Sequence, residues 1–322
     1  MPSVMLRFDL RNPSFAGVSS SERLRAALDM AAWADSHGGL AVSISEHHAS
    51  EDGYLPSPLI FAAAVAARTE KVGIAVSALA TPFYDPIRLA EDLAVVDNLS
   101  GGRLNVILGG GYLSHEFDMF GVPSNERGAR VERAVETLRN AWTGQPFEYE
   151  GRTIPRVTPV PDRPGGPTLI LGGSSDAAAR RAARLGLGYV PSTPESWEAY
   201  RRAVVEHGGE DPGPSTRGAV VTTCIAEDPE KAWDEFLPYF CHESNAYGEW
   251  LASEGFDGPY RSMEPDELRA SGQYRILTPD ECRVELDSMG AHAVLGLHPM
   301  VGGVPPERAW EMLDLIERTV LT

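Results

Sequence analysis

The chain has 322 residues, with 46 acidic and 28 basic side chains, a formal charge of −18, and 43% hydrophobic residues. This composition is typical of a globular enzyme, and the length suits either one (β/α)8 barrel or two ordinary domains. A surface this acidic repels phosphate backbones and anionic lipid headgroups, so we expect neither nucleic acid nor a membrane as a partner.

Short apolar runs alternate with amphipathic stretches along the first half of the chain. Strands are predicted at 4–8, 40–45, 72–79 and 104–108, and helices at 22–36, 58–68 and 86–99. Pro86 suits the first turn of the third helix. The glycine-rich loop Gly109-Gly110-Gly111 follows the fourth strand, then an irregular stretch to residue 125 and a long helix over 126–142.

The same alternation continues in the second half, after a connection over 143–167 that is rich in proline and glycine. Strands are predicted at 168–171, 188–190, 219–225 and 292–297, and helices at 176–185, 195–206, 229–240 and 306–320. Eight strand–helix pairs in this order imply parallel strands, and eight such units close into a barrel. We predict an α/β fold, a single (β/α)8 TIM barrel over 1–322 with insertions after strands 4 and 7. An open doubly wound sheet is the alternative, although no G-x-G-x-x-G follows the first strand.

The segment 241–277 fits neither a strand nor a barrel helix. It carries Trp250, Phe256, Tyr260 and Tyr274 among glycines and acidic residues. A long insertion after a barrel strand is either surface decoration or an active-site lid, and its exposed aromatic residues favour a lid.

Cysteine usage indicates the cellular compartment. Cys224, Cys241 and Cys282 are far apart and have no paired spacing, which favours a reducing compartment over a disulfide framework. The first residues show no basic start followed by an apolar stretch, and no segment reaches membrane-spanning length. The sequence predicts a cytoplasmic protein.

Glu46, His47 and His48 stand where the second predicted strand ends. The carboxyl ends of parallel strands are where chemistry collects in α/β proteins, and imidazoles exchange protons near neutral pH. Neighbouring residues in an extended chain point to opposite faces, so His47 and His48 are not expected to bind one metal ion. A pair of structural histidines is the alternative interpretation. We expect no metal.

Other motifs also follow predicted strands. Ser77 to Pro82 closes the third strand, glycines follow the fourth, Gly172-Gly173-Ser174-Ser175 follows the fifth, and His298-Pro299 follows the eighth. All of them are therefore predicted to face one mouth of the barrel, where structural histidines and glycines would instead scatter to both rims.

The chain resembles the bacterial luciferase-like monooxygenase superfamily, which contains flavin monooxygenases and oxidoreductases that use the deazaflavin coenzyme F420. In the first half of the chain, the motifs that carry this resemblance are Glu46-His47-His48 and the runs Asp85 to Asp92, Asp97 to Arg103 and Phe117 to Val122. Further along they are Arg127, Glu132 and the run Ala141 to Gly144. The last are Gly172 to Ser175, His298-Pro299 and Gly302 to Pro306. They cover nearly the whole chain except the predicted lid.

The resemblance implies a flavin ring in the barrel mouth with His47 as the acid–base residue beside it. It places a cis peptide bond between Ser77 and Ala78 beneath the ring, and the phosphate tail near the loop after strand five. Glu46 is expected to orient or pair, and His48 to be structural. The residues expected to bind the cofactor are Ser77, Ala78, Asn105, Gly109, Gly110, Gly172, Gly173, Ser174 and Ser175. Those expected to contact the substrate are Tyr54, Phe83, Tyr112 and His298.

Glycine and helix chemistry agree with a phosphate site at Gly172-Gly173. Glycine lets the backbone approach an anion closely, and a helix beginning near Asp176 directs its N–H groups toward it. A tight strand–helix turn is the alternative. Luciferases proper carry an arginine in the loop occupied here by Gly109 to Gly111, so this chain must neutralise phosphate otherwise, for instance through Arg180 or Arg181.

The leading hypothesis is a monooxygenase that takes reduced FMN from a separate flavin reductase and uses O2 to oxidise a small organic substrate. The runner-up is a coenzyme F420-dependent hydride-transfer reductase or dehydrogenase on the same fold. A non-catalytic flavin-binding subunit and a barrel hydrolase with a metal at Glu46 and His47 are weaker alternatives. The family also implies a homodimer.

Overall fold

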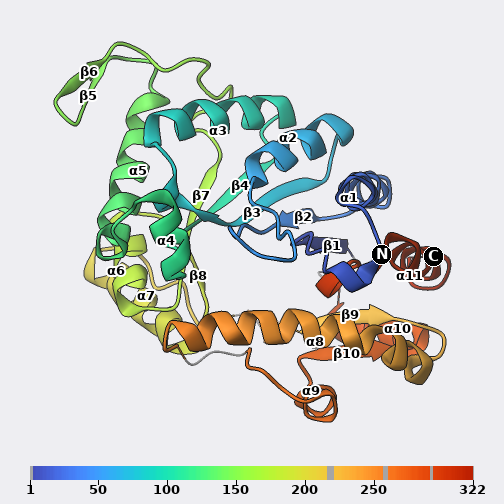
Figure 1. Cartoon of the computed structure of the whole chain (residues 1–322). Helices are drawn as coiled ribbons and strands as arrows, with labels where there is room; N and C mark the ends of the chain where they lie inside the picture. The colour runs from blue at the N-terminus through green and yellow to red at the C-terminus, as the bar shows by residue number, and fades with distance from the viewer. Residues whose placement is uncertain (1–2, 216–220, 257–259, 291–292, 322) are drawn as a thin grey trace. The chain divides into compact units, whose positions relative to one another are not determined.

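The computed structural model describes residues 3–215, 221–256, 260–290 and 293–321. The chain divides into two compact units. Unit 1 comprises Met1–Pro56, Arg68–Gly73 and Ala219–Thr322, and unit 2 comprises Ser57–Ala67 and Ile74–Gly218. Figure 1 labels the elements of both units, which we describe in turn.

Unit 1 contains five parallel strands in the hydrogen-bonded order β10-β9-β11-β1-β2 among its described residues. The strands are β1 (Ser3–Phe8), β2 (Ala41–Ile44), β9 (Thr222–Ile225), β10 (Tyr274–Leu277) and β11 (Val294–Leu297). The helices are α1 (Ser20–Ser36), α8 (Pro229–Ser253), α9 (Pro265–Ser271), α10 (Pro279–Met289) and α11 (Pro306–Thr319), with 3-10 turns η1 (Ser14–Ala16) and η5 (Val301–Gly303).

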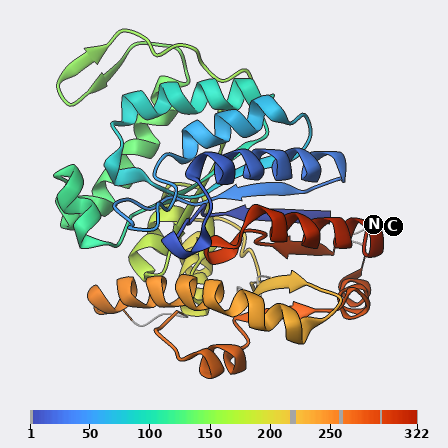
Figure 2. The same ribbon diagram turned by 45° about the vertical axis from the view of Figure 1, so that its right-hand side comes forward.

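Alternate side chains of β1 build the core of unit 1. Val4, Leu6 and Phe8 are fully buried, because successive residues of a strand point to opposite faces. Helices α1 and α11 lie side by side next to this strand, as Figure 2 shows. The opposite face of β1 therefore carries Met5 and Arg7, which are only partly buried.

Unit 2 contains four parallel strands in the order β3-β4-β7-β8, together with an antiparallel hairpin, β5-β6. The strands are β3 (Gly73–Ala80), β4 (Leu104–Gly109), β5 (Phe147–Tyr149), β6 (Arg152–Ile154), β7 (Thr168–Gly173) and β8 (Gly188–Pro191). The helices are α2 (Pro58–Arg68), α3 (Pro86–Ser100), α4 (Ser114–Phe120), α5 (Arg127–Ala141), α6 (Asp176–Arg184) and α7 (Pro194–Glu206), with 3-10 turns η2 (Thr81–Phe83) and η3 (Ser124–Glu126).

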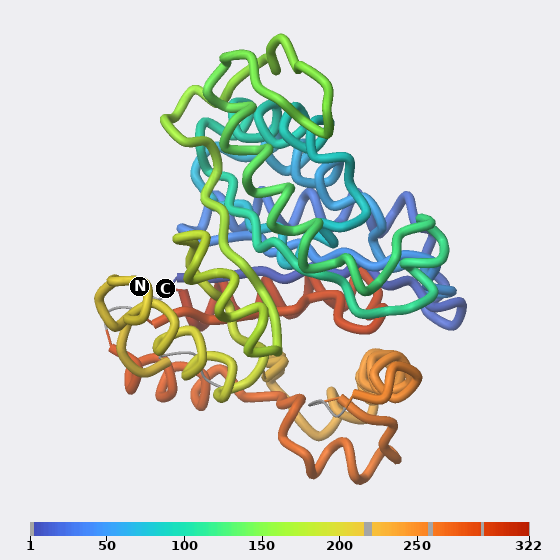
Figure 3. The backbone as a smooth tube through the Cα atoms, turned by 90° about the vertical axis from the view of Figure 1, so that its left-hand side faces the viewer, coloured from blue at the N-terminus to red at the C-terminus, as the bar shows by residue number. Residues whose placement is uncertain are grey.

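Local sequence explains where helices of unit 2 begin. The Asp85 side chain accepts hydrogen bonds from the backbone N–H groups of Ile87 and Arg88, and Pro86 occupies the first turn, as predicted. The β5-β6 hairpin extends outward from α3 and α5, as the tube in Figure 3 shows.

The structure confirms an α/β fold with parallel strands and corrects several predicted elements. The stretch expected to be irregular before residue 125 contains α4. The helix predicted to stop at residue 240 continues to Ser253, with Pro238 inside it, and the four-residue β10 lies within the segment predicted as a lid. The described residues thus hold nine parallel strands rather than eight. The predicted strand starts at Ala219 and His292 lie outside the described residues.

Two further findings concern the chain as described. All three cysteines are free thiols, as their spacing predicted. In the described part of the chain, no helix combines the length and apolar character needed to cross a membrane.

Candidate active site

The loop that follows β2 separates the roles of Glu46, His47 and His48. His48 Nε2 lies 3.0 Å from Glu46 Oε1, and both side chains are buried. His47 is only partly buried and turns its ring toward aromatic side chains. Glu46 therefore pairs with His48, as an ion-pair partner is expected to do, while the structural role of His48 stays a prediction.

His47 packs against an aromatic wall formed by Tyr54, Tyr247 and Trp250. The His47 ring centroid lies 5.0 Å from that of Tyr54, 4.7 Å from that of Trp250 and 6.1 Å from that of Tyr247. The Tyr54 and Tyr247 hydroxyls are hydrogen-bonded at 2.9 Å. Tyr54, predicted to contact substrate, is thus brought to His47, whereas Tyr247 and Trp250 come from α8.

Regular helix geometry places the α8 residues in this wall. Phe240, Glu243 and Tyr247 recur at spacings of three and four residues and are buried on one face of the helix. The periodic signal was present in the sequence, but the expectation that the helix ended at residue 240 hid it.

Arg11 lies under the same three rings that contact His47. Its guanidinium carbon is 4.8 Å from the Tyr54 centroid, 4.7 Å from the Tyr247 centroid and 4.6 Å from the Trp250 centroid. Such distances give a favourable cation–π interaction in a desolvated setting. Arg11 is fully buried, and its Nη1 donates to Asp52 Oδ2 at 2.5 Å. The three aromatic rings therefore shield the charged guanidinium of Arg11 from the side of the wall on which His47 lies.

The loop carrying His47 is tied to the end of β1 by backbone hydrogen bonds. The Leu55 N–H donates to the Asp9 carbonyl, and the Asn12 N–H donates to the Asp52 carbonyl. The His47 N–H donates to the Leu55 carbonyl. These bonds fix the backbone position from which the His47 side chain extends.

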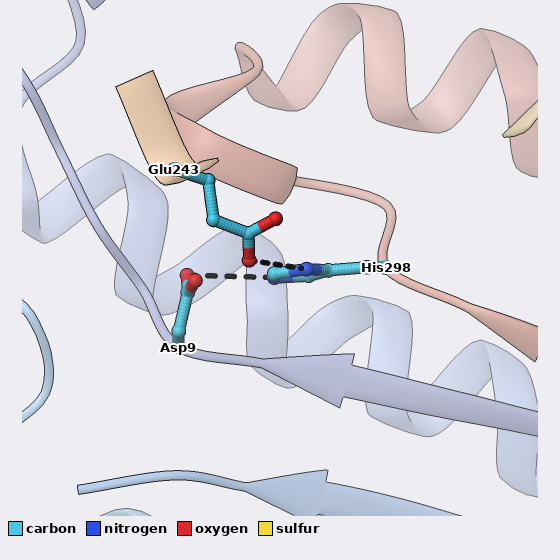
Figure 4. Close-up of side chains that lie close together, drawn as sticks. All are labelled: Asp9, Glu243 and His298. Carbon is cyan, nitrogen blue, oxygen red and sulfur yellow. Dashed lines mark ion pairs between the residues drawn. The ribbon is translucent and has the colours of Figure 1, made fainter. Parts of the chain in front are cut away.

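His298, predicted to contact substrate, is instead buried between two carboxylates. Its Nε2 lies 3.4 Å from Asp9 Oδ1 and its Nδ1 lies 3.4 Å from Glu243 Oε1, as the close-up in Figure 4 shows. The side chain is 3% exposed. Because His298 is so deeply buried, it supports the site from within the core and does not line its surface.

Arginines accompany this buried group. Arg7 Nη2 donates to the Tyr247 hydroxyl at 3.2 Å and lies 3.8 Å from Glu243, while Arg11 Nε lies 3.7 Å from Asp9 Oδ2. We name Arg7, Asp9, Arg11, Glu243 and His298 the charged cluster. The sequence analysis missed four of its five members. Residues 7, 9 and 11 are charged at alternate positions, but β1 ends at Phe8 and Leu10 has a positive φ of 59°, so strand alternation alone does not bring them together.

Burial controls the protonation of the hydroxyls on the wall. It raises the pKa of Tyr54 to about 12 and raises the pKa of Tyr247 well above its usual range. Both phenols therefore keep their protons at neutral pH and act as neutral hydrogen-bonding groups.

In unit 2, three neighbouring strands end with residues predicted to bind the cofactor. The Ser77-Ala78 peptide bond is cis, which confirms the prediction, and β3 shifts register there against β4. A Cβ on Gly109 would lie 3.0 Å from the Ala78 Cβ, so only glycine fits beside Ala78 without displacement. Ser77, Ala78 and Gly109 are thus brought together.

The end of β7 approaches neighbouring atoms as closely. A Cβ on Gly172 would lie 2.9 Å from Ile107 Cγ2, and one on Gly173 would lie 2.7 Å from the Ala178 Cβ. Ser174 and Ser175 are exposed, and the Ser175 hydroxyl accepts from the Ala178 N–H at the start of α6. This glycine turn, exposed hydroxyl and nine-residue helix form a donor set that fits a phosphate group.

The arginines suggested as phosphate partners are already engaged. Arg181 Nε donates to Glu132 at 2.8 Å, and Arg180 pairs with Glu206 at 3.7 Å. Arg181 is the more firmly paired of the two, and the Arg180–Glu206 pair is more than half exposed, so a phosphate contact from either arginine stays a prediction.

The other predicted residues of unit 2 occupy different places: Asn105 pairs with Thr168 at the beginning of β7, whereas Gly109 follows Leu108, which pairs with Leu171 next to the glycine turn. Asn105 Nδ2 donates to the Arg103 carbonyl at 3.3 Å. Phe83 stacks on Phe120, with 4.8 Å between ring centroids, and borders a cavity of about 340 Å³. Tyr112 is partly buried, as are Gly109 and Gly110.

The segment predicted as a lid begins with the last turns of α8, and its later part packs against them. Met263 N–H donates to Asn245 Oδ1 at 3.0 Å, and a Cβ on Gly248 would lie 2.5 Å from the Arg261 backbone carbon. Tyr260 stacks on Tyr247 with 4.9 Å between centroids. Closure of 241–277 over a ligand stays a prediction.

The sequence and the fold are both similar to those of known proteins. Residues 6–287 match the family model of luciferase-like monooxygenases. The chain belongs to this family. The luciferase-like chain also superposes on the crystal structure of monooxygenase RslO1 from Streptomyces bottropensis with a TM-score of 0.77 and 26% identity, covering 99% of this chain and 98% of that one. This likeness confirms the predicted luciferase-like TIM-barrel class.

Two relatives in this family have different cofactors in their names. An F420-dependent glucose-6-phosphate dehydrogenase of Nocardia farcinica is 30% identical over 188 residues, covering 55% of each chain. The oxygenase component of a flavin-dependent trigonelline monooxygenase of Acinetobacter baylyi is 30% identical over 132 residues, covering 40% of this chain and 36% of that one. The luciferase-like chain spans about half the length of the first curated relatives that it matches.

Proposed function

We propose that this luciferase-like protein is a flavin-dependent monooxygenase that uses reduced FMN and O2 to oxidise a small organic substrate. The observation that carries the proposal is the partly buried His47 against the aromatic wall, in a chain that matches the family over residues 6–287. Reduced flavin, when bound, supplies the electrons that activate oxygen.

His47 is the acid–base residue of this proposal. Its ring contacts three aromatic rings and stays partly accessible, so a ligand can approach one side while the wall fixes the other. A histidine in this setting moves a proton to or from a substrate atom, which contributes about 10²- to 10⁴-fold to a rate. The wall also excludes water and favours a planar, apolar substrate.

The residues of unit 2 serve cofactor binding in this proposal. Ser77, Ala78 and Gly109 offer a flat backbone surface for a ring, because no side chain projects from Gly109. Gly172 and Gly173 with the exposed Ser174 hold the phosphate through backbone N–H groups and a hydroxyl. Asn105, Gly110 and Ser175 are assigned to the same function on the family resemblance.

The proposed enzyme works with a partner protein in the cytoplasm. A separate flavin reductase supplies reduced FMN, in keeping with the description of the trigonelline relative as an oxygenase component. The substrate contacts are assigned to Tyr54, Phe83 and Tyr112. A homodimer in the cytoplasm completes the proposal.

Coenzyme F420-dependent hydride transfer is the second candidate. It is favoured by the relative from Nocardia farcinica and by the glycines that stand where luciferases proper carry a phosphate-binding arginine. The same His47 would then exchange a proton with the substrate while the deazaflavin carries hydride.

Isotope labelling with a panel of small planar substrates tests the first candidate. The protein receives reduced FMN from an added reductase under ¹⁸O2, and we expect ¹⁸O in a product. His47→Ala is expected to reduce the rate at least about 10²-fold. His37→Gln is the matched control, because His37 pairs with Glu317 away from the wall. Hydride exchange with F420 and no ¹⁸O uptake in any product would favour the second candidate instead.

A further inference from the structure

The charged cluster places a carboxylate beside each ring nitrogen of His298, although within the described residues neither nitrogen makes a hydrogen bond. The two ring nitrogens face different carboxylates, Nε2 toward Asp9 and Nδ1 toward Glu243, each at 3.4 Å. Figure 4 shows the imidazole between them. A neutral imidazole carries a proton on one nitrogen and would turn a lone pair toward one of these carboxylates. Only the doubly protonated ring presents an N–H to both.

Because these side chains are buried, their charges strongly affect the stability of the cluster. Asp9 and Glu243 side chains are fully buried, and His298 is 3% exposed. An uncompensated charge in such a place costs several kcal/mol, so buried carboxylates need cationic partners. The arginine contacts, Arg7 to Glu243 and Arg11 to Asp9, are longer than the contacts to His298.

Asp9 and Glu243 are the two charged groups that face His298. Each has further neighbours: Arg7 and Arg11 act on Asp9, and Arg7, Cys224 of β9 and Tyr274 of β10 interact with Glu243. Tyr274 donates to Glu243 Oε2 at 2.7 Å, which favours the ionised carboxylate. Burial lowers the pKa of His298, but the charges of Asp9 and Glu243 outweigh burial and raise it.

We propose that His298 is held as an imidazolium at neutral pH and is a positioning residue that links Asp9 to Glu243. Glu243 in turn holds Arg7, and Arg7 donates to the Tyr247 hydroxyl on the wall against which His47 packs. The cationic ring therefore fixes Arg7 and Tyr247 without touching a ligand.

A metal ion is the competing occupant. One donor atom from each of Asp9, Glu243 and His298 lies within 4.8 Å of the others. However, one ion can take only one ring nitrogen, while the two nitrogens here face separate carboxylates. The guanidiniums of Arg7 and Arg11 also lie within 4 Å of these carboxylates and repel a second cation.

Histidine-selective ¹⁵N NMR on the intact wild-type protein tests the proposal. The His298 signals are assigned as those missing from His298→Gln or, if that variant does not fold, as those perturbed by both Asp9→Asn and Glu243→Gln. We expect two protonated ring nitrogens at pH 7. A neutral tautomer at pH 7, or a stoichiometric metal bound to this ring, would overturn the proposal.

Charge-compensation variants separate positioning from packing. Asp9→Asn and Glu243→Gln should each lower the pKa of His298 by about one unit or more, because each removes one facing charge. Glu317→Gln, which alters an exposed carboxylate beside His37, should leave the His298 signals unchanged. Unchanged His298 titration in Asp9→Asn and Glu243→Gln would contradict the proposal.

Rescue of stability by a second substitution provides another test of the same proposal. His298→Gln combined with Asp9→Asn should be more stable than His298→Gln alone at pH 7, because Arg11 keeps Asp52 as a partner. If His298 served only to fill space, the second substitution would add a further loss, and that result would contradict the proposal.

Discussion

His47 of the loop after β2 lies against Trp250 of α8, with 4.7 Å between the ring centroids. The contact joins His47 to a helix far away in sequence. Arg11 lies 4.6 Å from the same Trp250 ring, so one indole contacts both the partly buried His47 and a fully buried arginine. The position of the wall therefore determines the surroundings of His47.

The hydrogen bond between the Tyr54 and Tyr247 hydroxyls predicts non-additive losses of stability. Tyr54→Phe and Tyr247→Phe should each lower the free energy of unfolding by about 1 kcal/mol. The double variant should lose less than the sum, with a coupling energy of about 1 kcal/mol, because either substitution already removes the shared bond. Urea unfolding of the four proteins measures this energy. Additive losses would show that the hydroxyls do not interact.

Tyr200 provides the control for this cycle. Its hydroxyl donates to the Leu187 carbonyl at 3.0 Å and shares no partner with Tyr54. Tyr200→Phe combined with Tyr54→Phe should therefore be additive within about 0.5 kcal/mol.

The pairing of Asp52 predicts a dependence of stability on pH. Burial by itself raises the pKa of Asp52, but the His242 hydrogen bond and the charge of Arg11 outweigh it and lower the pKa below its usual range. The stability from this carboxylate is therefore present above its unfolded pKa of about 3.9 and is lost as the pH falls toward the folded pKa. Asp52→Asn should cost about 3 kcal/mol at pH 7, because it removes the closer of the two carboxylates that pair with the buried Arg11.

Urea unfolding of wild type and Asp52→Asn between pH 3 and pH 8 checks this expectation. The difference in unfolding free energy should narrow below about pH 4. Asp29→Asn is the control, since the Asp29–Arg68 pair is more than half exposed and should contribute at most about 0.5 kcal/mol. A difference that grows with acidity would contradict the assignment.

Adjacent glycines after β4 should respond differently to alanine. A Cβ at Gly109 would lie 3.0 Å from the Ala78 Cβ and 3.2 Å from the Leu79 carbonyl oxygen, whereas one at Gly110 meets nothing within 4 Å. Gly109→Ala should therefore destabilise the protein by about 2 kcal/mol, and Gly110→Ala by less than about 0.5 kcal/mol. Thermal unfolding distinguishes the two. Equal effects would contradict the close approach of Gly109 to β3.

Much of the fold was predictable because parallel strands are short apolar runs bounded by turn residues. The ends of β3, β4 and β7 were predicted to within two residues, with Gly109, Gly172 and Gly173 belonging to the strand ends, and the cis bond at Ser77-Ala78 was predicted correctly. These features depend on local sequence or on a family pattern, which one chain displays in full.

The charged cluster was beyond that reasoning because its members meet only through tertiary structure. Glu243 reaches Asp9 because α8 continues past residue 240, and local glycine and aromatic content obscured that continuation. His298 looked like a residue of the barrel mouth because it follows a strand, yet packing of α8 and β1 encloses it. Arg7 lies on β1, whereas Asp9 and Arg11 follow the strand around a positive-φ Leu10, a turn that strand periodicity does not predict.

Anaerobic titration of the purified protein tests the central claim of a reduced-FMN enzyme most directly. Reduced FMN, oxidised FMN and reduced F420 are added separately, and binding is followed by Trp fluorescence, to which Trp250 beside His47 contributes. The account predicts saturable binding of reduced FMN that is at least tenfold tighter than that of oxidised FMN or reduced F420. Binding of reduced F420 alone, or indifference to every flavin, would contradict it.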